Sequence, residues 1–136
     1  MKESVFQFTN PALTQMEFLI NDGFDSEKKS VKMRVTLNVN ILPDNNNNNA
    51  KVSLTCELGE QNKESPFWLK VVEQANFKWN KDINETTKKK LLNQNAPALL
   101  LSYLRPIVSQ ITASSMYGAY NIPFCDFTID NDKSNF

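Results

Sequence analysis

The segment VKMRVTLNVNI, residues 31–41, alternates apolar and polar side chains without a break. Every second position from Val31 to Ile41 is apolar, and the positions between them are lysine, arginine, threonine or asparagine. A period of two over a segment of this length is typical of a β-strand with one buried face and one solvated face. Strands of this kind belong to antiparallel sheets, so the segment predicts an antiparallel sheet.

Three further segments complete the predicted sheet. The return strand KVSLTCEL, residues 51–58, follows the asparagine-rich run at 44–50, which we expect to form the flexible tip of a hairpin. The segment FWLKVVEQANFKW, residues 67–79, predicts another strand with apolar side chains on both faces. A weaker strand is expected around QMEFLIN, residues 15–21, with residues 21–30 as its loop. The order is four strands, and helices follow them.

Helical patterns occupy the chain after residue 84. Asn84 or Thr86 is a suitable N-cap for a short helix through residues 87–95. The segment APALLLSYLRPIVSQI, residues 96–111, predicts an apolar helix, because large aliphatic side chains recur at helical spacing. We expect this helix to start near Pro97, which is tolerated in a first helical turn.

Pro106 lies inside the predicted apolar helix. A proline in a helix interior removes one hydrogen bond and clashes with the carbonyl four residues earlier, at a cost of about 3 kcal/mol. We therefore expect a bend near residues 102–105, or a break with a new helix that begins at Pro106. The helix should end near residues 114–118.

These elements predict a two-layer α+β domain, in which a four-stranded antiparallel sheet has one face covered by a long helix. The chain of 136 residues has the length of one domain, which we expect to span residues 1–136 with a polar tail at 128–136. The apolar arc of the helix is wide enough to contact both its own sheet and a second copy of the chain.

Composition excludes most enzyme chemistry. The chain has no histidine, which removes Ser-His-Asp and Cys-His nucleophilic arrangements and histidine-based zinc sites. Two cysteines cannot build a four-cysteine zinc site, and three glycines leave no glycine-rich phosphate loop. We therefore expect no enzyme, no metal and no cofactor.

Charge and hydropathy indicate where the protein works. The 15 basic and 15 acidic side chains cancel, so no long-range field attracts nucleic acid or an anionic membrane. The apolar runs are far shorter than the roughly 20 residues that span a bilayer, and the first residues lack the pattern of a signal peptide. We expect a cytoplasmic protein without membrane insertion or a nucleic-acid partner, with Cys56 and Cys125 as buried thiols.

The order of elements and residues 97–127 resemble SecB, the family of bacterial protein-export chaperones. In that family a helix opens with a proline, an aliphatic run and Tyr-x-Arg, here Pro97, residues 99–101, Tyr103 and Arg105. The segment SMYGAYNIPFCDF, residues 115–127, is similar to the aromatic turn and apolar stretch that follow the helix in the family. FWLKVVEQANFKW looks like its fourth strand.

The resemblance implies an ATP-independent holdase that binds unfolded or precursor polypeptides in exposed apolar grooves. It also implies a homotetramer, built as a dimer of dimers, with SecA or an antitoxin as a further candidate partner. As client-binding residues we select aromatic and large aliphatic side chains off the main core face: Trp68, Val72, Phe77, Trp79, Tyr117, Tyr120 and Ile122. For the contact between subunits we select Leu100, Tyr103, Leu104, Ile107 and Ile111.

Trp68 is the most informative of these residues. It lies on the face opposite Phe67 and Leu69, so we expect another subunit or a ligand to cover it. The chain departs from the family in its lack of an acidic surplus and in its short tail, features that help members dock SecA. Two alternatives therefore stand beside a chaperone for Sec-dependent export. One is a dedicated chaperone of a toxin–antitoxin system, and the other is a module for a small apolar ligand or single-stranded nucleic acid.

Overall fold

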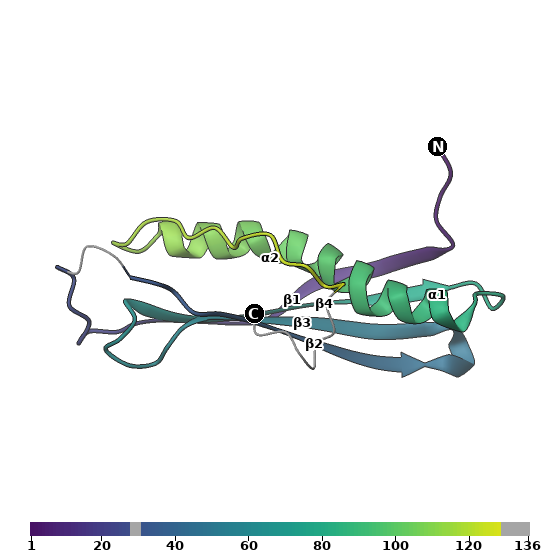
Figure 1. Cartoon of the computed structure of the whole chain (residues 1–136), viewed down its shortest axis with the longest axis horizontal. Helices are drawn as coiled ribbons and strands as arrows, with labels where there is room; N and C mark the ends of the chain where they lie inside the picture. Colours follow the sequence, from purple (N-terminus) through teal and green to yellow (C-terminus); the bar gives the residue numbers. More distant parts are fainter. Residues whose placement is uncertain (28–30, 129–136) are drawn as a thin grey trace.

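The four strands form one antiparallel sheet, and the helices lie across one of its faces (Figure 1). The computed structural model describes residues 1–27 and 31–128. The strands are β1 (Phe6–Ile20), β2 (Val35–Asp44), β3 (Asn49–Gly59) and β4 (Phe67–Trp79), in the spatial order β1-β4-β3-β2. The helices are α1 (Glu85–Lys90) and α2 (Ala96–Ala113). The predicted fold, a four-stranded antiparallel sheet with a long helix on one face, is confirmed.

The asparagine-rich run forms the turn of the β2–β3 hairpin. A short 3-10 turn, η1 (Asn45–Asn47), is followed by Asn48 in the left-handed conformation, with φ of 52°. Asparagine visits that region more readily than most residues, so this composition suits a tight connection. The two strands pair from Val35 with Leu58 to Asp44 with Asn49.

β2 begins four residues later than the alternation predicts and ends later too. Residues 31–34 are not part of the strand, because the neighbouring strand β3 ends at Gly59. The N–H of Gly59 donates to the carbonyl of Arg34, and Gly59 then turns the chain with a φ of 76°, which favours glycine. The expected strand at 31–41 is therefore wrong in its first four residues.

β1 is much longer than expected, since it starts at Phe6 rather than near residue 15. Its pairing with β4 shifts register between Thr9 and Ala12 and again between Leu13 and Gln15. Each shift moves the following side chains to the opposite face of the sheet. The two shifts therefore hide the period of two over most of this strand.

The core lies between the helices and the sheet. Three leucine and valine side chains of α2, at Leu100, Leu104 and Val108, are completely buried there. The sheet contributes fully buried side chains that include Leu54 and Val71. Burying a side chain of this size stabilises the fold by about 1.5–3 kcal/mol. The packing of α2 on the central strands is therefore the main source of stability.

The two helices are one continuous helical segment rather than the two separate helices expected. Between α1 and α2 lies a π-helical turn, η2 (Leu91–Asn95), in which the N–H of Ala96 donates to the carbonyl of Leu91. Pro97 follows directly, and it lacks an N–H group and crowds the carbonyl four residues before it. A widened turn at this point accommodates the proline without ending the helix.

Asn84 caps the helical segment as expected. Its side chain accepts hydrogen bonds from the N–H groups of Thr86 and Thr87, at 2.7 and 3.3 Å. The break proposed at Pro106 is wrong, because α2 continues through that residue to Ala113. Pro106 lies on the exposed side of the helix, where water can satisfy the carbonyl that loses its intrahelical donor.

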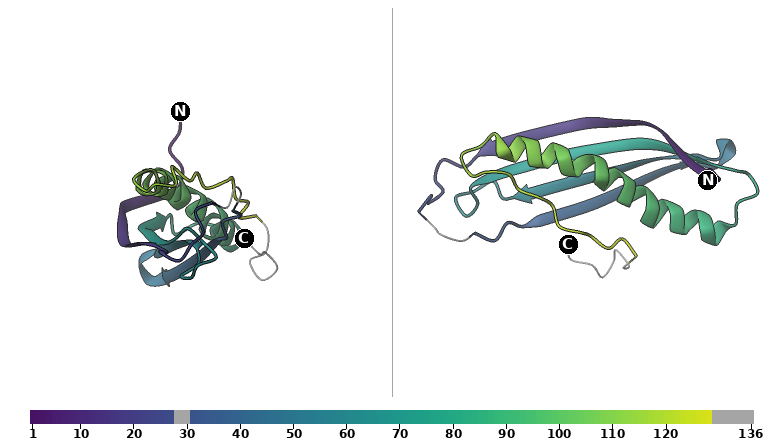
Figure 2. Two further views of the ribbon diagram at one scale, coloured as in Figure 1. Left: turned by 90° about the vertical axis from the view of Figure 1, so that its left-hand side faces the viewer. Right: turned by 90° about the horizontal axis from the view of Figure 1, so that it is seen from above.

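An extended segment after α2 returns alongside the helix (Figure 2). Ile122 and Phe127 from this segment join the core. The guanidinium of Arg105 holds the segment in place, because Nη2 donates to the carbonyl of Ile122 at 2.6 Å and the group lies 4.9 Å from the ring of Phe124. The polar tail expected at 128–136 lies outside the described residues beyond Thr128.

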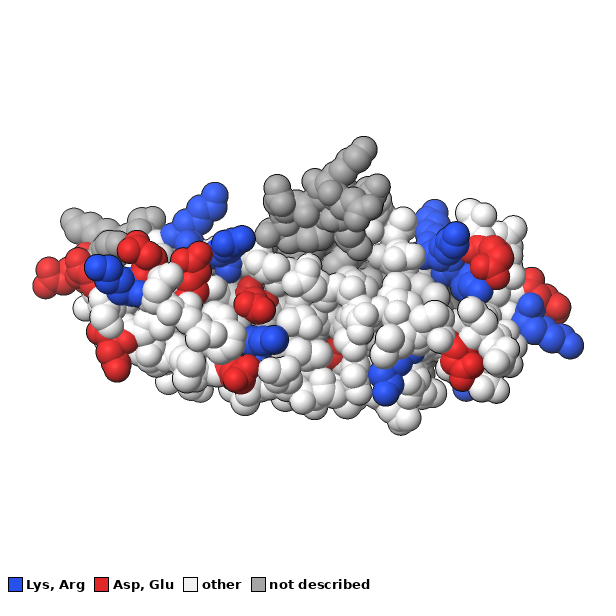
Figure 3. Space-filling model, turned by 90° about the horizontal axis from the view of Figure 1, so that it is seen from below, with Lys and Arg blue, Asp and Glu red and all other residues white. Residues whose placement is uncertain are grey.

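The opposite face of the sheet, which we call the open face, carries no helix (Figure 1). Acidic and basic side chains are scattered over it among many uncharged ones, without a large area of one sign (Figure 3). Its polar character is clear along β3, where Lys51, Ser53, Thr55 and Glu57 alternate with buried apolar residues. The alternation predicted from the sequence thus separates a core face from a solvated face.

Glu73 is the exception on the helix-facing side of the sheet. Its neighbours across the strands are Leu13 and Leu54, and the other paired positions on this side are apolar. The side chain is only 3% exposed, and Oε2 has no hydrogen-bond partner. Burial raises the pKa of this carboxyl group above its usual value, because the charged form loses its hydration.

We predict that Glu73→Gln stabilises the protein at neutral and basic pH but not at acidic pH. Because the pKa of Glu73 is raised in the folded state, the folded protein holds this proton more tightly than the unfolded chain. Stability therefore falls as the pH rises from the usual glutamate pKa through the raised one. Urea unfolding of both proteins at pH 4 and pH 8 measures this, and Glu17→Gln on the exposed part of β1 is the control. Equal pH dependence in wild type and Glu73→Gln would contradict the prediction.

Candidate functional site

An apolar groove lies between the loop that follows β1 and the segment that follows α2. It consists of two adjoining cavities of about 220 and 460 Å³, which share Met33 and Tyr120. The first, the aromatic pocket, is lined by Phe24, Ser26, Val31, Met33, Pro66, Phe67, Tyr117, Gly118, Ala119 and Tyr120. The second, the basic pocket, is lined by Lys32, Met33, Arg34, Val35, Tyr120 and Pro123.

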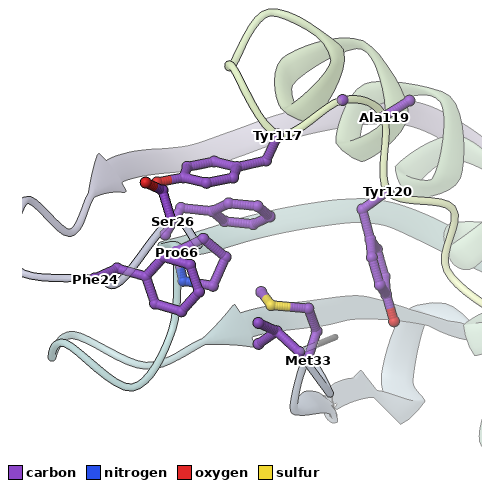
Figure 4. A pocket seen from close by; sticks show the side chains of 10 residues that line it. Phe24, Ser26, Met33, Pro66, Tyr117, Ala119 and Tyr120 are labelled. Atoms are coloured by element: carbon purple, nitrogen blue, oxygen red, sulfur yellow. The ribbon is translucent and has the colours of Figure 1, made fainter. Parts of the chain in front are cut away.

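Three aromatic rings form one wall of the aromatic pocket. The ring of Tyr117 meets that of Phe24 edge-on, with centroids 5.9 Å apart and an angle of 82°, and it lies 6.4 Å from the ring of Phe67. Figure 4 shows Tyr117 above Phe24 and Pro66, with Met33 and Tyr120 on the other side of the space. Phe67 is anchored in the core at the start of β4, so the wall has a fixed base.

Tyr120 forms the boundary between the two pockets. Its backbone N–H donates to Oγ1 of Thr112 at 2.7 Å, and the same hydroxyl donates to the carbonyl of Val108 at 2.7 Å. Thr112 is completely buried, so it fixes the start of the extended segment on the last turn of α2. Between the two tyrosines, Gly118 has a φ of 82°, and this conformation turns the chain back along the helix.

Two ionisable side chains at or near the groove, Tyr120 and Cys56, have raised pKa values. Burial raises the pKa of Tyr120, so its phenol keeps its proton at neutral pH and remains a hydrogen-bond donor. Close by, burial raises the pKa of Cys56 to about 12, and Cys125 and Glu57 contribute to the same shift. A thiol with so high a pKa is not a nucleophile at neutral pH. Both cysteines are free, and Cys56 is buried as expected, whereas Cys125 is only partly buried.

The described residues also bear on metal binding and membrane insertion. Among residues 1–27 and 31–128, no group of three or more histidine, cysteine, aspartate or glutamate side chains is placed to hold a metal ion. Over the same residues, no helix combines the length and the apolar character needed to cross a membrane. The groove is distinguished by its aromatic lining.

The structure brings together only part of the predicted client-binding set. Tyr117 and Tyr120 line the groove, and Ile122 follows them in the chain but is completely buried in the core. Phe77 and Trp79 are also buried, at the far end of β4, where Phe6 stacks on Phe77 with centroids 5.3 Å apart. These buried side chains support the fold at a distance from the groove.

Trp68 and Val72 lie on the open face. Trp68 is only 7% exposed, so the expectation that another subunit or a ligand must cover it is wrong. Leu19 and Gly59 are its neighbours on the adjacent strands, and it shares a surface hollow with Glu60 and other residues near the ends of β2 and β3. The sequence alone does not show how little of Trp68 the folded chain leaves exposed. Val72 is half-buried on the same face.

Sequence reasoning missed Phe24 and Met33 as site residues. Phe24 is the only aromatic residue in the otherwise polar stretch 21–30, and that isolation was a usable signal. Met33 was assigned to the buried face of a strand, although the chain at that point lies outside the sheet. Its flexible thioether instead lies between the two pockets, where it can adapt to ligands of different shape.

The residues selected for contact between subunits divide into two sets. Leu100 and Leu104 are completely buried against their own sheet, whereas Tyr103 is 38% exposed and Ile107 and Ile111 are partly buried. Tyr103 packs edge-on against Phe8 of β1, with centroids 6.4 Å apart. On the helix-facing side of β1, three more apolar side chains are exposed, and these are Leu13, Met16 and Ile20. We call one set of apolar side chains the β1–α2 strip, and its members are Tyr103, Ile107 and Ile111 of α2 and Leu13, Met16 and Ile20 of β1.

A four-stranded antiparallel sheet with one long helical segment across one face is the SecB-like fold. The model of the family described as preprotein translocase subunit SecB matches residues 16–129. The chain belongs to the SecB family, and the resemblance inferred from residues 97–127 is confirmed. No curated protein matches the chain by sequence.

Two solved structures share the fold. The first is the Mycobacterium tuberculosis SecB-like chaperone Rv1957 in complex with a ChAD peptide from the Rv1956 HigA1 antitoxin, with a TM-score of 0.72 at 13% identity. The match covers 88% of this chain and 90% of that chain. The second is a protein of unknown function from Streptococcus agalactiae, with a TM-score of 0.52, 13% identity and coverage of 88% and 97%. At these identities the likeness shows the fold.

We predict that Thr112→Val destabilises the protein and loosens the wall of the groove. Valine has the same shape but no hydroxyl, so the N–H of Tyr120 loses its acceptor at a cost of about 1–3 kcal/mol. Chemical denaturation measures the stability, and hydrogen exchange at Tyr120 measures the local opening. Thr112→Ser retains the hydroxyl and is the matched control. Slow exchange at Tyr120 in the valine variant would show that this bond does not hold the segment.

Proposed function

We propose that this protein is a molecular chaperone without enzymatic activity, which holds unfolded polypeptide chains in the groove. The observation that carries the proposal is the aromatic pocket, where Phe24, Phe67 and Tyr117 surround an open cavity of about 220 Å³. A client phenylalanine, leucine or methionine that is buried there contributes about 1.5–3 kcal/mol. Several such contacts hold a client tightly and still reversibly, and no step requires ATP.

The groove also suits an extended backbone. Residues 31–33 run beside it outside the sheet, and within the described part of the chain their backbone groups make no hydrogen bond. An extended client next to this segment gains main-chain hydrogen bonds whatever its sequence, as in other proteins that bind peptides by strand addition. Apolar pockets and a free strand-like edge together favour unfolded polypeptide over a small apolar ligand.

Self-association is the second part of the proposal. The β1–α2 strip exposes apolar side chains that a soluble monomer would normally cover, and the net charge of zero does not oppose association. We propose a cytoplasmic homotetramer, built as a dimer of dimers, in which a sister subunit covers this strip through Tyr103, Ile107 and Ile111. The grooves stay open in this arrangement because the strip and the groove lining share no residue, although they adjoin where Ile20 pairs with Phe67.

A dedicated antitoxin chaperone is the second candidate function. The mycobacterial protein of the same fold was solved with an antitoxin peptide, which supports a client of that kind. Acidic sheet residues help other family members dock SecA, and the mixed charges of the open face do not favour that contact here (Figure 3). A toxin–antitoxin gene pair next to the gene for this chain would support the antitoxin role. A requirement for this protein in Sec-dependent export would instead support the export role.

The double variant Phe24→Ser/Tyr117→Ser is expected to lose most of its ability to suppress aggregation of a denatured client. Both rings line the aromatic pocket and neither is a fully buried core residue, so the fold should survive. Light scattering of a chemically denatured enzyme upon dilution measures the effect. Leu42→Ser is the control, because that side chain is 57% exposed and lies outside the groove. Undiminished protection by the double variant would place client binding elsewhere.

The native particle is expected to have about four times the 15.6 kDa mass of the chain. Tyr103→Asp places a charge in the β1–α2 strip and should shift the mass toward smaller species, since burying an unpaired charge is costly. Light scattering coupled to size-exclusion chromatography gives the mass. Met116→Asp, at a residue 78% exposed beyond the helix end, is the control. A wild-type protein of single-chain mass would refute the assembly.

A further inference from the structure

The charges that line the groove have one sign. The aromatic pocket has no charged residue in its lining, and the basic pocket has two, Lys32 and Arg34. Among residues 1–27 and 31–128, no aspartate or glutamate lines either cavity. This asymmetry is local, because acidic and basic residues balance over the whole chain. A ligand in the groove therefore meets positive charge at one end only.

The cations stand next to apolar surface. Met33, Val35, Tyr120 and Pro123 complete the lining of the basic pocket. A carboxylate that approaches this pocket is partly shielded from water by that apolar surface, which strengthens its attraction to a neighbouring cation relative to a fully exposed pair. Long basic side chains can also keep their aliphatic stems against the same surface.

Arg34 has only a weak partner within the protein. Its Nη1 lies 3.6 Å from Oε1 of Glu60, and the two side chains are 74% and 39% exposed. Exposed pairs of this kind contribute little to stability, so a ligand carboxylate can compete for Arg34. Within the described residues, Lys32 forms no ion pair. Both cations are therefore available to a ligand.

We propose that the groove selects extended polypeptide segments in which an acidic residue lies within a few positions of a large apolar one. The inference rests on the proposed function and names the client sequences that the groove prefers. The apolar side chain enters the aromatic pocket, and the carboxylate reaches Lys32 and Arg34 in the adjoining pocket. Tyr120 and Met33 line both pockets, so one short segment spans them.

Two fluorescent peptides test this proposal. They share one apolar core of phenylalanine and leucine, and they differ only in two flanking positions, which are aspartate in one peptide and lysine in the other. Fluorescence anisotropy at low and at high salt gives the dissociation constants with the full-length protein. We expect the aspartate peptide to bind about tenfold more tightly at low salt, because it gains attraction where the lysine peptide meets repulsion. The difference should shrink at high salt, which screens exposed charges.

Charge-reversal variants identify the residues responsible. Lys32→Glu/Arg34→Glu should reverse the preference, and its binding of the lysine peptide shows that the variant is folded. Glu60→Gln frees Arg34 from its partner and should tighten binding of the aspartate peptide about twofold. Lys51→Glu/Lys78→Glu is the matched control, because it changes the net charge equally at exposed positions of β3 and β4, away from the groove. It should retain the wild-type preference.

The outcomes separate the two proposals. Equal binding of both peptides, or the same change in the control as in the Lys32/Arg34 variant, overturns the selectivity and leaves the chaperone function standing. Binding of neither peptide overturns both. A preference for the lysine peptide also refutes the charge selection. It would mean that Asp22, Asp25 and Glu27, which follow β1 and lie outside the lining, determine the charge preference of the groove.

Discussion

The packing of α2 against the two central strands is the contact on which the rest of the structure depends. Leu100, Leu104 and Val108 lose all their exposed surface there. One helical segment is too narrow to cover a four-stranded sheet, and it crosses the sheet at an angle (Figure 2). Apolar surface therefore remains on both sides of the helix. The extended segment after α2 closes one side, and part of β1 stays exposed on the other.

This incomplete cover explains why an aromatic groove is open at the surface. The groove forms where the chain after α2 crosses back over the start of β4 and the residues before β2, so it is built from segments far apart in the sequence. Its walls are held by the core below, through Phe67, and by Thr112 at the end of the helix. A rigid base with adaptable upper side chains suits ligands that share apolar character rather than one shape.

Much of the fold could be predicted from the sequence, because it depends on local patterns. The alternation at 31–41 and 51–58 gave the hairpin, and the aliphatic repeat at 96–111 gave the helix. The prediction failed where pairing with a strand far away in the sequence determines which residues belong to the sheet. β1 conceals its period behind two register shifts, and residues 31–34 leave the sheet because β3 ends at Gly59.

The site was less predictable for the same reason. Tyr117 and Tyr120 could be selected from the family resemblance, whereas Phe24 and Met33 reach the groove only through the path of a long loop. Trp68 was misjudged because a strand pattern shows which face a side chain takes but not how much of it the folded chain leaves exposed. The sequence likewise gave no sign that Glu73, one of several polar residues of β4, has a buried carboxylate oxygen without a hydrogen-bond partner.

The turn between the two tyrosines lies entirely outside the packed layers. A methyl group added to Gly118 would meet no atom within 4 Å, so the surroundings leave this turn free and only its backbone angle constrains it. An exposed position of the turn such as Ala119 can therefore change without disturbing the interior, whereas any side chain at Gly118 is strained by its φ of 82°. Related proteins with one common scaffold can in this way diverge in the chains they recognise while they keep the same architecture.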